Sequence, residues 1–267
     1  VGTKKALFSF ATPLPYTPII LRYQDANLRI LDGRNKWPDE YTFVIVLINF
    51  DYKLIRICTG AMITEVWGLT AAHCTAHGMP FHAWFSNFTE PPIRLDTAAE
   101  VLETFAHPAF RVIKQGSGFV DNDISLFLSS RVNVRSFARL SSVDRTALVG
   151  LPVTYVGGGG TVINIIKHQK KFTFKQLQVG EGAIVRCNEE MQSMSKYVIC
   201  VSPKCTNRLE KAYLGDSGGP LIHDNRIIGI CSFAISISDV SAGGFTPISP
   251  YLDWIYLIMN SKDKKIT

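Results

Sequence analysis

Features that would assign several common functions are missing from this sequence. No Cys-x-x-Cys pair occurs, so neither a thioredoxin-type redox motif nor a zinc ribbon is indicated. The glycine run at 157–160 is not followed by Gly-Lys-Ser/Thr, so we interpret it as a loop leaving a strand, not a phosphate-binding loop. The longest apolar runs, such as 43–48, have strand length and fall short of the ~18–20 residues of a membrane span.

The charge pattern argues against a nucleic-acid partner. Lys and Arg total 28 and Asp and Glu total 22, which gives a net charge of +6. The basic residues are scattered in small groups, with no basic stripe interleaved with aromatic residues as in a nucleic-acid groove. We therefore expect neither a nucleic-acid nor a membrane partner, and no cofactor is indicated.

Short β-rich runs separated by turn signals fill most of the chain from residue 30 onward. These runs predict a β-sandwich or barrels, and they include 43–50, 53–58, 61–69, 81–85, 101–105, 124–128, 152–157, 183–187, 197–201, 220–222 and 227–233. Residues 1–29 hold three prolines without clear periodicity and are interpreted as an extension or pro-segment. Ser249 as N-cap and Pro250 in the first turn predict a C-terminal helix from about 250 to 260.

Six cysteines, an even number, favour disulfides formed in an oxidising compartment. Cys58, His73, Cys74 and His77 are close enough in sequence to suggest a metal site as an alternative. The adjacency of His73 and Cys74 fits known metal-binding spacings poorly, so no metal is expected. A sequon at Asn87 agrees with a secreted, glycosylated protein.

The stretch YLGDSGGPLI at 213–222 places Ser217 between an aspartate and two glycines. A serine hydroxyl is a poor nucleophile unless a base accepts its proton and a third group fixes the tautomer of that base. His73, in LTAAHC, and Asp123, in DNDISL at the start of an apolar strand, are candidates for these two roles. The three side chains together indicate nucleophilic catalysis.

These three motifs, in this order, resemble those of the trypsin/chymotrypsin family of serine proteases. The likeness runs from about residue 30 to 260 and also includes CTGAMITEVWGLTAAHC, AHPAF, GICSFA and GGFTPISPYLDWI. The resemblance implies an all-β fold of two six-stranded antiparallel β-barrels, at about 30–143 and 144–248, with a C-terminal α-helix. It also implies a pro-segment at 1–29 before a peptidase domain at 30–267.

The resemblance further implies roles for individual residues. Ser217 would be the nucleophile, His73 the general base and then acid, and Asp123 the group that orients His73. The backbone N–H groups of Gly215 and Ser217 would form the oxyanion hole that stabilises the transition state.

An activation switch is implied by RILDGR at 29–34, which resembles the family's activation site. Cleavage after Arg29 would free the α-amino group of Ile30, which would pair with Asp216 inside the protein. The alternative for this stretch is a surface turn. On the first interpretation the uncleaved chain is a zymogen, and its partners are an activating protease, a protein or peptide substrate and, as a further candidate, a protease inhibitor.

The expected specificity pocket departs from the family pattern. Lys211 stands six residues before Ser217, where trypsin-like enzymes carry an aspartate, and a lysine cannot attract a substrate Arg or Lys. Lys211 either points into the pocket and favours an acidic substrate residue, or the loop is shifted and Lys211 is exposed. The other pocket positions implied by the resemblance are Leu214, Cys231, Ser232, Phe233, Ala234 and Gly244.

The resemblance implies the disulfides Cys58–Cys74 and Cys187–Cys200, which leaves Cys205–Cys231 as the third pair. That third bridge would narrow or close the pocket, because Cys231 lies on the strand behind it. Two functions therefore stay open. The first is a secreted serine endopeptidase of non-tryptic or restricted specificity, and the second is a catalytically silent homologue that acts by binding.

Overall fold

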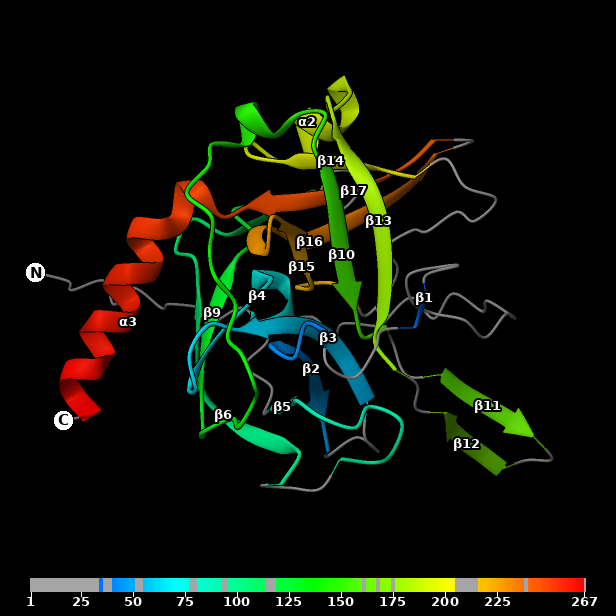
Figure 1. Cartoon of the computed structure of the whole chain (residues 1–267), viewed down its shortest axis with the longest axis vertical. Coiled ribbons are helices and arrows are strands. Elements are labelled where there is room, and N and C mark those ends of the chain that lie inside the picture. The colour runs from blue at the N-terminus through cyan, green and yellow to red at the C-terminus, as the bar shows by residue number, and fades with distance from the viewer. Residues whose placement is uncertain are drawn as a thin grey trace, which may run out of the picture.

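The computed structural model describes residues 34–35, 40–50, 55–76, 81–92, 96–113, 119–159, 162–166, 169–173, 176–204, 216–237 and 240–266. Within these ranges the chain forms two antiparallel β-barrels and a C-terminal helix (Figure 1). The predicted all-β class and the two six-stranded barrels are confirmed. Within the described ranges, no helix is both long and apolar enough to cross a membrane.

The first barrel is closed by six strands from the N-terminal half of the chain. Their spatial order is β2 (Val44–Asn49), β3 (Ile55–Met62), β4 (Trp67–Thr70), β9 (Ser125–Ser129), β6 (Ala98–Ala106) and β5 (His82–Trp84), with β5 pairing back to β2. Its interior is filled by side chains such as Ile45, Leu47, Met62 and Phe127, all at most 1% exposed.

The second barrel belongs to a seven-stranded sheet. The order is β1 (Arg34–Asn35), β13 (Gln178–Val185), β10 (Pro152–Gly157), β15 (Pro220–His223), β16 (Arg226–Ile237), β17 (Val240–Pro247) and β14 (Ile199–Pro203). Pairing of β14 with β13 closes the six strands other than β1 into a barrel. The short strand β1 pairs with the first residues of β13, at Gln178 and Val179. Tyr155, Leu221 and Phe245 lie in its core.

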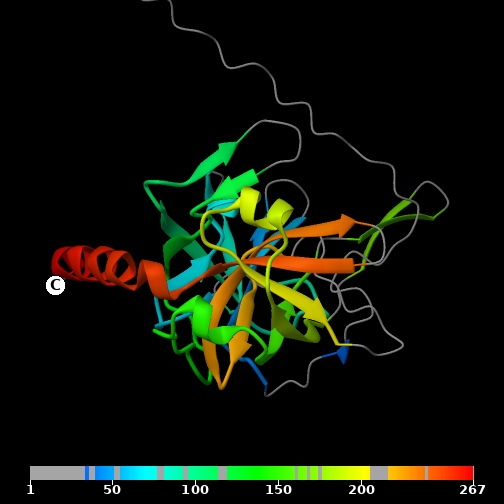
Figure 2. The same ribbon diagram turned by 90° about the horizontal axis from the view of Figure 1, so that it is seen from above.

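The remaining elements are short except for the last helix. They are α1 (Ala72–Thr75), α2 (Glu189–Met194), α3 (Leu252–Ile266), the 3-10 turns η1 (Arg145–Leu148) and η2 (Ser249–Tyr251), and the hairpins β7 (Arg111–Ile113) with β8 (Phe119–Asp121) and β11 (Val162–Ile166) with β12 (Gln169–Thr173). The helix α3 extends from one side of the molecule (Figure 2). Its residues Leu252, Ile255 and Met259 pack on one apolar cluster, as their spacing predicts.

Several boundaries differ from the sequence prediction, and two of the differences have a visible cause. The run 61–69, expected as one strand, is broken by a turn at 63–66, where the hydroxyl of Thr64 accepts the backbone N–H groups of Val66 and Trp67. The final helix continues to Ile266, beyond the expected 260, and the ammonium group of Lys262 lies 2.7 Å from the carboxylate of Glu103 on β6. This contact ties the last turns of α3 to the first barrel.

The packing of the first barrel predicts a large loss of stability for Phe127→Ala. Phe127 is fully buried, and the ring of Phe127 fills the space where a side chain on Gly68 would otherwise lie. We expect urea unfolding to report a loss of about 3–5 kcal/mol, as for other buried aromatic deletions. The matched control is Phe137→Ala, which removes a ring that is 39% exposed and should change stability by less than about 0.5 kcal/mol. Equal losses in the two variants would contradict this account.

Candidate active site

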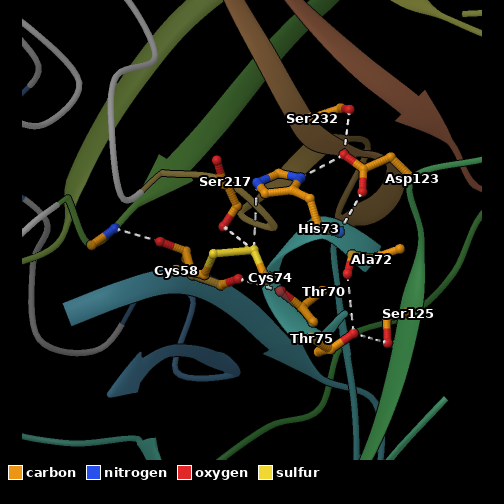
Figure 3. Close-up of a disulfide and its surroundings, with 12 residues drawn as sticks. Cys58, Thr70, Ala72, His73, Cys74, Thr75, Asp123, Ser125, Ser217 and Ser232 are labelled. Atoms are coloured by element: carbon orange, nitrogen blue, oxygen red, sulfur yellow. Dashed lines mark hydrogen bonds and ion pairs between the residues drawn. A yellow bond between two sulfur atoms is a disulfide. The ribbon is translucent and has the colours of Figure 1, made fainter. Parts of the chain in front are cut away.

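His73 and Asp123 are brought together by two neighbouring strands of the first barrel, since β4 pairs with β9 and Thr70 lies opposite Ser125. His73 lies on α1, directly after β4, and Asp123 lies in the loop that leads from β8 into β9. The ring Nδ1 of His73 is 2.7 Å from one carboxylate oxygen of Asp123, and the backbone N–H of His73 donates to the other at 2.8 Å. Both oxygens of this carboxylate therefore face one residue, which fixes the direction of the imidazole ring (Figure 3).

The carboxylate of Asp123 is only 1% exposed and has a further partner from the second barrel. The hydroxyl of Ser232, on β16, donates to the same oxygen that receives His73 Nδ1, at 2.5 Å. A buried carboxylate is tolerated only when donors replace its lost hydration. This contact of the Ser232 hydroxyl with Asp123 was not predicted from the sequence, where Ser232 was expected only as a pocket residue.

The environment of His73 shifts its pKa in a definite direction. Burial alone lowers the pKa of the imidazole, but the negative charge of Asp123 and its hydrogen bond raise it, and the net result is a pKa above the ordinary 6.5. Because Nδ1 is directed to Asp123, Nε2 is the ring nitrogen that can accept a proton in the neutral form, and it lies 3.7 Å from the sulfur of Cys74.

Ser217 lies in a tight turn that leads into β15. Figure 3 shows it beside the imidazole of His73 and above the Cys58–Cys74 disulfide. Its carbonyl accepts the backbone N–H of Thr59 on β3 at 2.8 Å. Among the described residues, no hydrogen bond joins its hydroxyl to His73 Nε2; catalytic bonds of this kind commonly tighten only when substrate is bound.

The turn around Ser217 needs glycine at the next position. Gly218 has φ +80°, and a side chain there would overlap the hydroxyl of Thr70 and the carbonyl of Thr59. The N–H of Gly218 donates to the carbonyl of Cys231 at 2.7 Å, and the N–H of Cys231 donates to the carbonyl of Gly219 at 2.8 Å. The turn is thus fixed to β3 of the first barrel and to β16 of the second.

One supporting contact was not foreseen from the sequence. Asn122, immediately before Asp123, has φ +53°, and its side-chain oxygen accepts the hydroxyl of Tyr251 at 3.0 Å. Its side-chain N–H₂ group donates to the carbonyl of Ala109. Asparagine tolerates a left-handed backbone better than most residues. An asparagine directly before Asp123 is therefore the one sequence feature that could have predicted this turn.

Two of the three expected disulfides are present. Cys58 is bonded to Cys74, which joins β3 to α1, and Cys187 is bonded to Cys200. The sulfur atoms of Cys58 and Cys74 lie close to a ring nitrogen of His73, as ligands of a metal would. Because the two sulfurs are bonded to each other, they offer no thiolate to a metal.

The third expected bridge, Cys205–Cys231, is wrong, since Cys231 is a free cysteine. Its side chain is buried in the core of the second barrel with Tyr155, Leu221 and Phe245. The register of β16 shifts between Cys231 and Phe233, and at this irregularity Ser232 turns toward Asp123 while Cys231 packs into the barrel core. The expectation that a disulfide closes the pocket is therefore also wrong.

The other expected pocket residues are only partly described. The ring of Phe233 lies across Gly244, where any side chain would overlap it. Ala234 lies on β16 and pairs with Gly243. The expected site and switch residues Arg29, Ile30, Lys211, Leu214 and Gly215, together with Cys205, lie outside the described residues.

Comparison with known proteins places the chain in a family. The trypsin family model matches residues 31–255. The chain belongs to the trypsin family. It is 25% identical over 253 residues to a trypsin of Phaedon cochleariae, covering 86% of this chain and 88% of that protein. It is 28% identical over 253 residues to serine protease 1 of Drosophila melanogaster, covering 90% and 87%.

Solved structures of two proteases share the fold of this trypsin-family chain. Neuropsin, a serine protease of mouse brain, superposes with a TM-score of 0.65 at 22% identity, covering 86% of this chain and 100% of that one. An HL collagenase superposes with a TM-score of 0.67 at 20% identity, covering 86% and 99%. The named relatives are proteases, so at the level of the family the chemistry is protein hydrolysis.

The burial of the free thiol of Cys231 predicts that this thiol resists alkylation in the folded protein. Burial, followed by the charges of Asp216 and Asp123, raises the pKa of Cys231 well above its ordinary value, so it carries no thiolate at neutral pH. Without reductant, we expect iodoacetamide to leave Cys231 unmodified in the folded protein and to alkylate it after denaturation, as read by peptide mass spectrometry. A Cys231-containing disulfide peptide would contradict the assignment.

Proposed function

We propose that this chain is a secreted serine endopeptidase in which Ser217, His73 and Asp123 form the catalytic triad. One observation carries the proposal: both oxygens of the buried Asp123 carboxylate are engaged by His73. This arrangement leaves Nε2 of the imidazole as the only ring position able to accept a proton from Ser217. Buried carboxylates are costly, so a site that keeps one against a histidine favours acid–base chemistry.

The proposed reaction follows from these positions. Ser217 Oγ attacks the peptide carbonyl while His73 Nε2 takes its proton, and the imidazolium formed is stabilised by Asp123. His73 then gives the proton to the leaving amine, which breaks the peptide bond and leaves an acyl group on Ser217. Water, activated by His73, releases that acyl group. The backbone N–H groups of Ser217 and Gly215 are the proposed oxyanion donors.

We also propose that the chain is made as a zymogen, with residues 1–29 as the pro-segment and 30–267 as the peptidase domain. Cleavage after Arg29 by another protease would let the new amino group of Ile30 pair with Asp216. Asp216 is 2% exposed and lies directly before Ser217. One of its oxygens accepts the N–H of Gly159 at 3.0 Å. Pairing of the buried carboxylate with the cationic amino group would stabilise the turn that bears Ser217.

Secretion and glycosylation are supported by two local features. The disulfides Cys58–Cys74 and Cys187–Cys200 are of a kind that persists in oxidising compartments. Asn87 is exposed, and its side-chain oxygen accepts the hydroxyl of Thr89 at 2.9 Å within the sequon. A glycan on Asn87 would therefore meet solvent.

Non-tryptic or restricted specificity follows from the pocket positions, as Lys211 stands where an aspartate would attract basic residues. Pocket changes of this kind also favour the second candidate, a silent homologue that acts by binding. The two candidates differ in whether Ser217 becomes reactive, and family membership alone does not decide between them.

The first test is activation-dependent labelling of Ser217. Replacing residues 25–29 with an Asp-Asp-Asp-Asp-Lys sequence lets enteropeptidase cut before Ile30 while sparing the other basic sites. A fluorophosphonate probe should then add its mass to Ser217 after cleavage, and much more slowly before it.

Its control is Ser217→Ala on the same background, which should be cleaved equally and remain unlabelled. Cleaved, folded protein that fails to react would contradict the proposed protease and favour the binding homologue.

The second test uses pH. Because Asp123 raises the pKa of His73, the imidazole holds its proton to a higher pH than an ordinary histidine does. The reactive neutral form therefore predominates only at a higher pH. The rate of probe labelling should rise with pH through one proton, with a midpoint above 6.5.

The matched variant is Asp123→Asn, which keeps the side-chain shape but favours the wrong tautomer and should lower peptide hydrolysis by about 10⁴-fold. A wild-type midpoint below 6.5, or an Asp123→Asn protein with unchanged rate, would count against the triad.

A further inference from the structure

A short loop after β10 is held by two side chains that come from the other barrel. Arg56 Nη1 donates to the carbonyl of Gly158 at 2.8 Å, and the hydroxyl of Thr59 accepts the N–H of Gly158 at 2.9 Å. Both partners lie on β3, about a hundred residues earlier in the chain. The two backbone polar groups of Gly158 are thus bound by side chains of the first barrel.

Besides making these hydrogen bonds, Gly158 packs closely against the first barrel. Arg56 is 4% exposed and Thr59 is fully buried. A side chain on Gly158 would approach a methyl group of Val46 on β2 to 2.5 Å, closer than real contacts allow. The loop therefore lies directly against the wall of the first barrel, and its position is set there.

The residues on either side of Gly158 contact Asp216. The N–H of Gly159 donates to the Asp216 carboxylate at 3.0 Å, and any side chain on Gly157 would overlap that carboxylate. The backbone N–H of Thr59 in turn donates to the carbonyl of Ser217 at 2.8 Å. A continuous path of contacts thus leads from Thr59 through the loop and Asp216 to Ser217, and back to Thr59.

Arg56 is itself fixed in place. Its guanidinium group lies over the ring of Trp84, 4.6 Å from the ring centre, and its Nη2 donates to the carbonyl of Phe88 at 2.6 Å. A guanidinium held by an aromatic face and carbonyl groups loses little freedom when it binds a third group. The carbonyl of Gly158 therefore meets a preorganised donor.

We propose that Arg56 and Thr59 are positioning residues for the reaction of Ser217. By holding Gly158 they fix the loop that binds Asp216, and so fix the backbone of Asp216 and Ser217 from which the oxyanion donor projects. This inference rests on the proposed function, and neither side chain contacts the substrate. The oxyanion donor stabilises negative charge that develops only in the transition state. A shift of this donor should therefore lower kcat more than it raises KM.

The decisive variant is Thr59→Val, which keeps the shape of the side chain and removes the acceptor for Gly158 N–H. A buried N–H without a partner is costly, so the loop should shift. We expect kcat and the fluorophosphonate labelling rate to fall about tenfold, with KM changed less than about twofold. Thr59→Ser, which keeps the hydroxyl, should restore both rates.

The matched control is Ser129→Ala, which deletes another buried hydroxyl of the first barrel, on β9 and away from this path. It should leave kcat unchanged. Arg56→Met removes the donor to the carbonyl of Gly158. Since Arg56→Met and Thr59→Val both act through one loop, the fall in kcat of the double variant should be smaller than the product of the two single falls. Unchanged kcat in Thr59→Val, or equal loss in Ser129→Ala, would overturn the proposal.

A second readout does not need an active enzyme. In the Ser217→Ala background, Thr59→Val should speed amide hydrogen exchange in peptides covering 157–159 and 216–219, whereas Ser129→Ala should not. If wild type fails to label but this pattern appears, the proposed protease function fails while the coupling stands. If wild type labels and the exchange of these peptides is unchanged in Thr59→Val, the coupling fails alone.

Discussion

The carboxylate of Asp123 is the group on which the rest of the site depends. It is buried, and it accepts hydrogen bonds from the ring and backbone of His73 and from the hydroxyl of Ser232. A buried charge without hydrogen-bond donors would be strongly destabilising, so movement of these donors away from Asp123 is costly. The carboxylate therefore fixes the position of His73, and the rest of the fold must place Ser217 beside the imidazole.

Both barrels contribute to bringing Ser217 there. The first barrel supplies His73 and Asp123, and the second supplies the strand β16 that carries Ser232 and pairs with the turn after Ser217. Contacts that cross between barrels, such as Thr59 N–H to the Ser217 carbonyl, align the two halves. A site divided in this way responds to any change that moves one barrel relative to the other, including changes remote from the reacting atoms.

Much of this arrangement could be predicted from the sequence. The motifs around His73, Asp123 and Ser217 lie in local patterns, and the resemblance of residues 58–74 to a family loop implied the Cys58–Cys74 bridge that joins β3 to α1. The alternation of short apolar runs gave the all-β class, and the spacing of Leu252, Ile255 and Met259 gave the final helix. These features depend on residues that are near one another in the chain.

The errors and omissions concern contacts between distant residues. Counting cysteines paired Cys231 with Cys205, whereas Cys231 is a free cysteine packed into the barrel core. The roles of Arg56 and Thr59 toward Gly158 could not be read from sequence, because nothing local distinguishes a buried arginine on a strand from a solvated one. The contact of the Ser232 hydroxyl with Asp123 was missed for the same reason, since the two residues are 109 positions apart in the chain.

We infer that Asp123 holds His73 in the Nδ1–H tautomer and raises the pKa of its imidazole. Nitrogen-15 NMR of the histidine side chains, with His73 assigned through a His73→Gln variant, measures tautomer and pKa together without requiring turnover. The account predicts a protonated Nδ1, an unprotonated Nε2 at high pH, and a titration midpoint above 6.5. An Nε2–H tautomer, or a midpoint below that value, would contradict it.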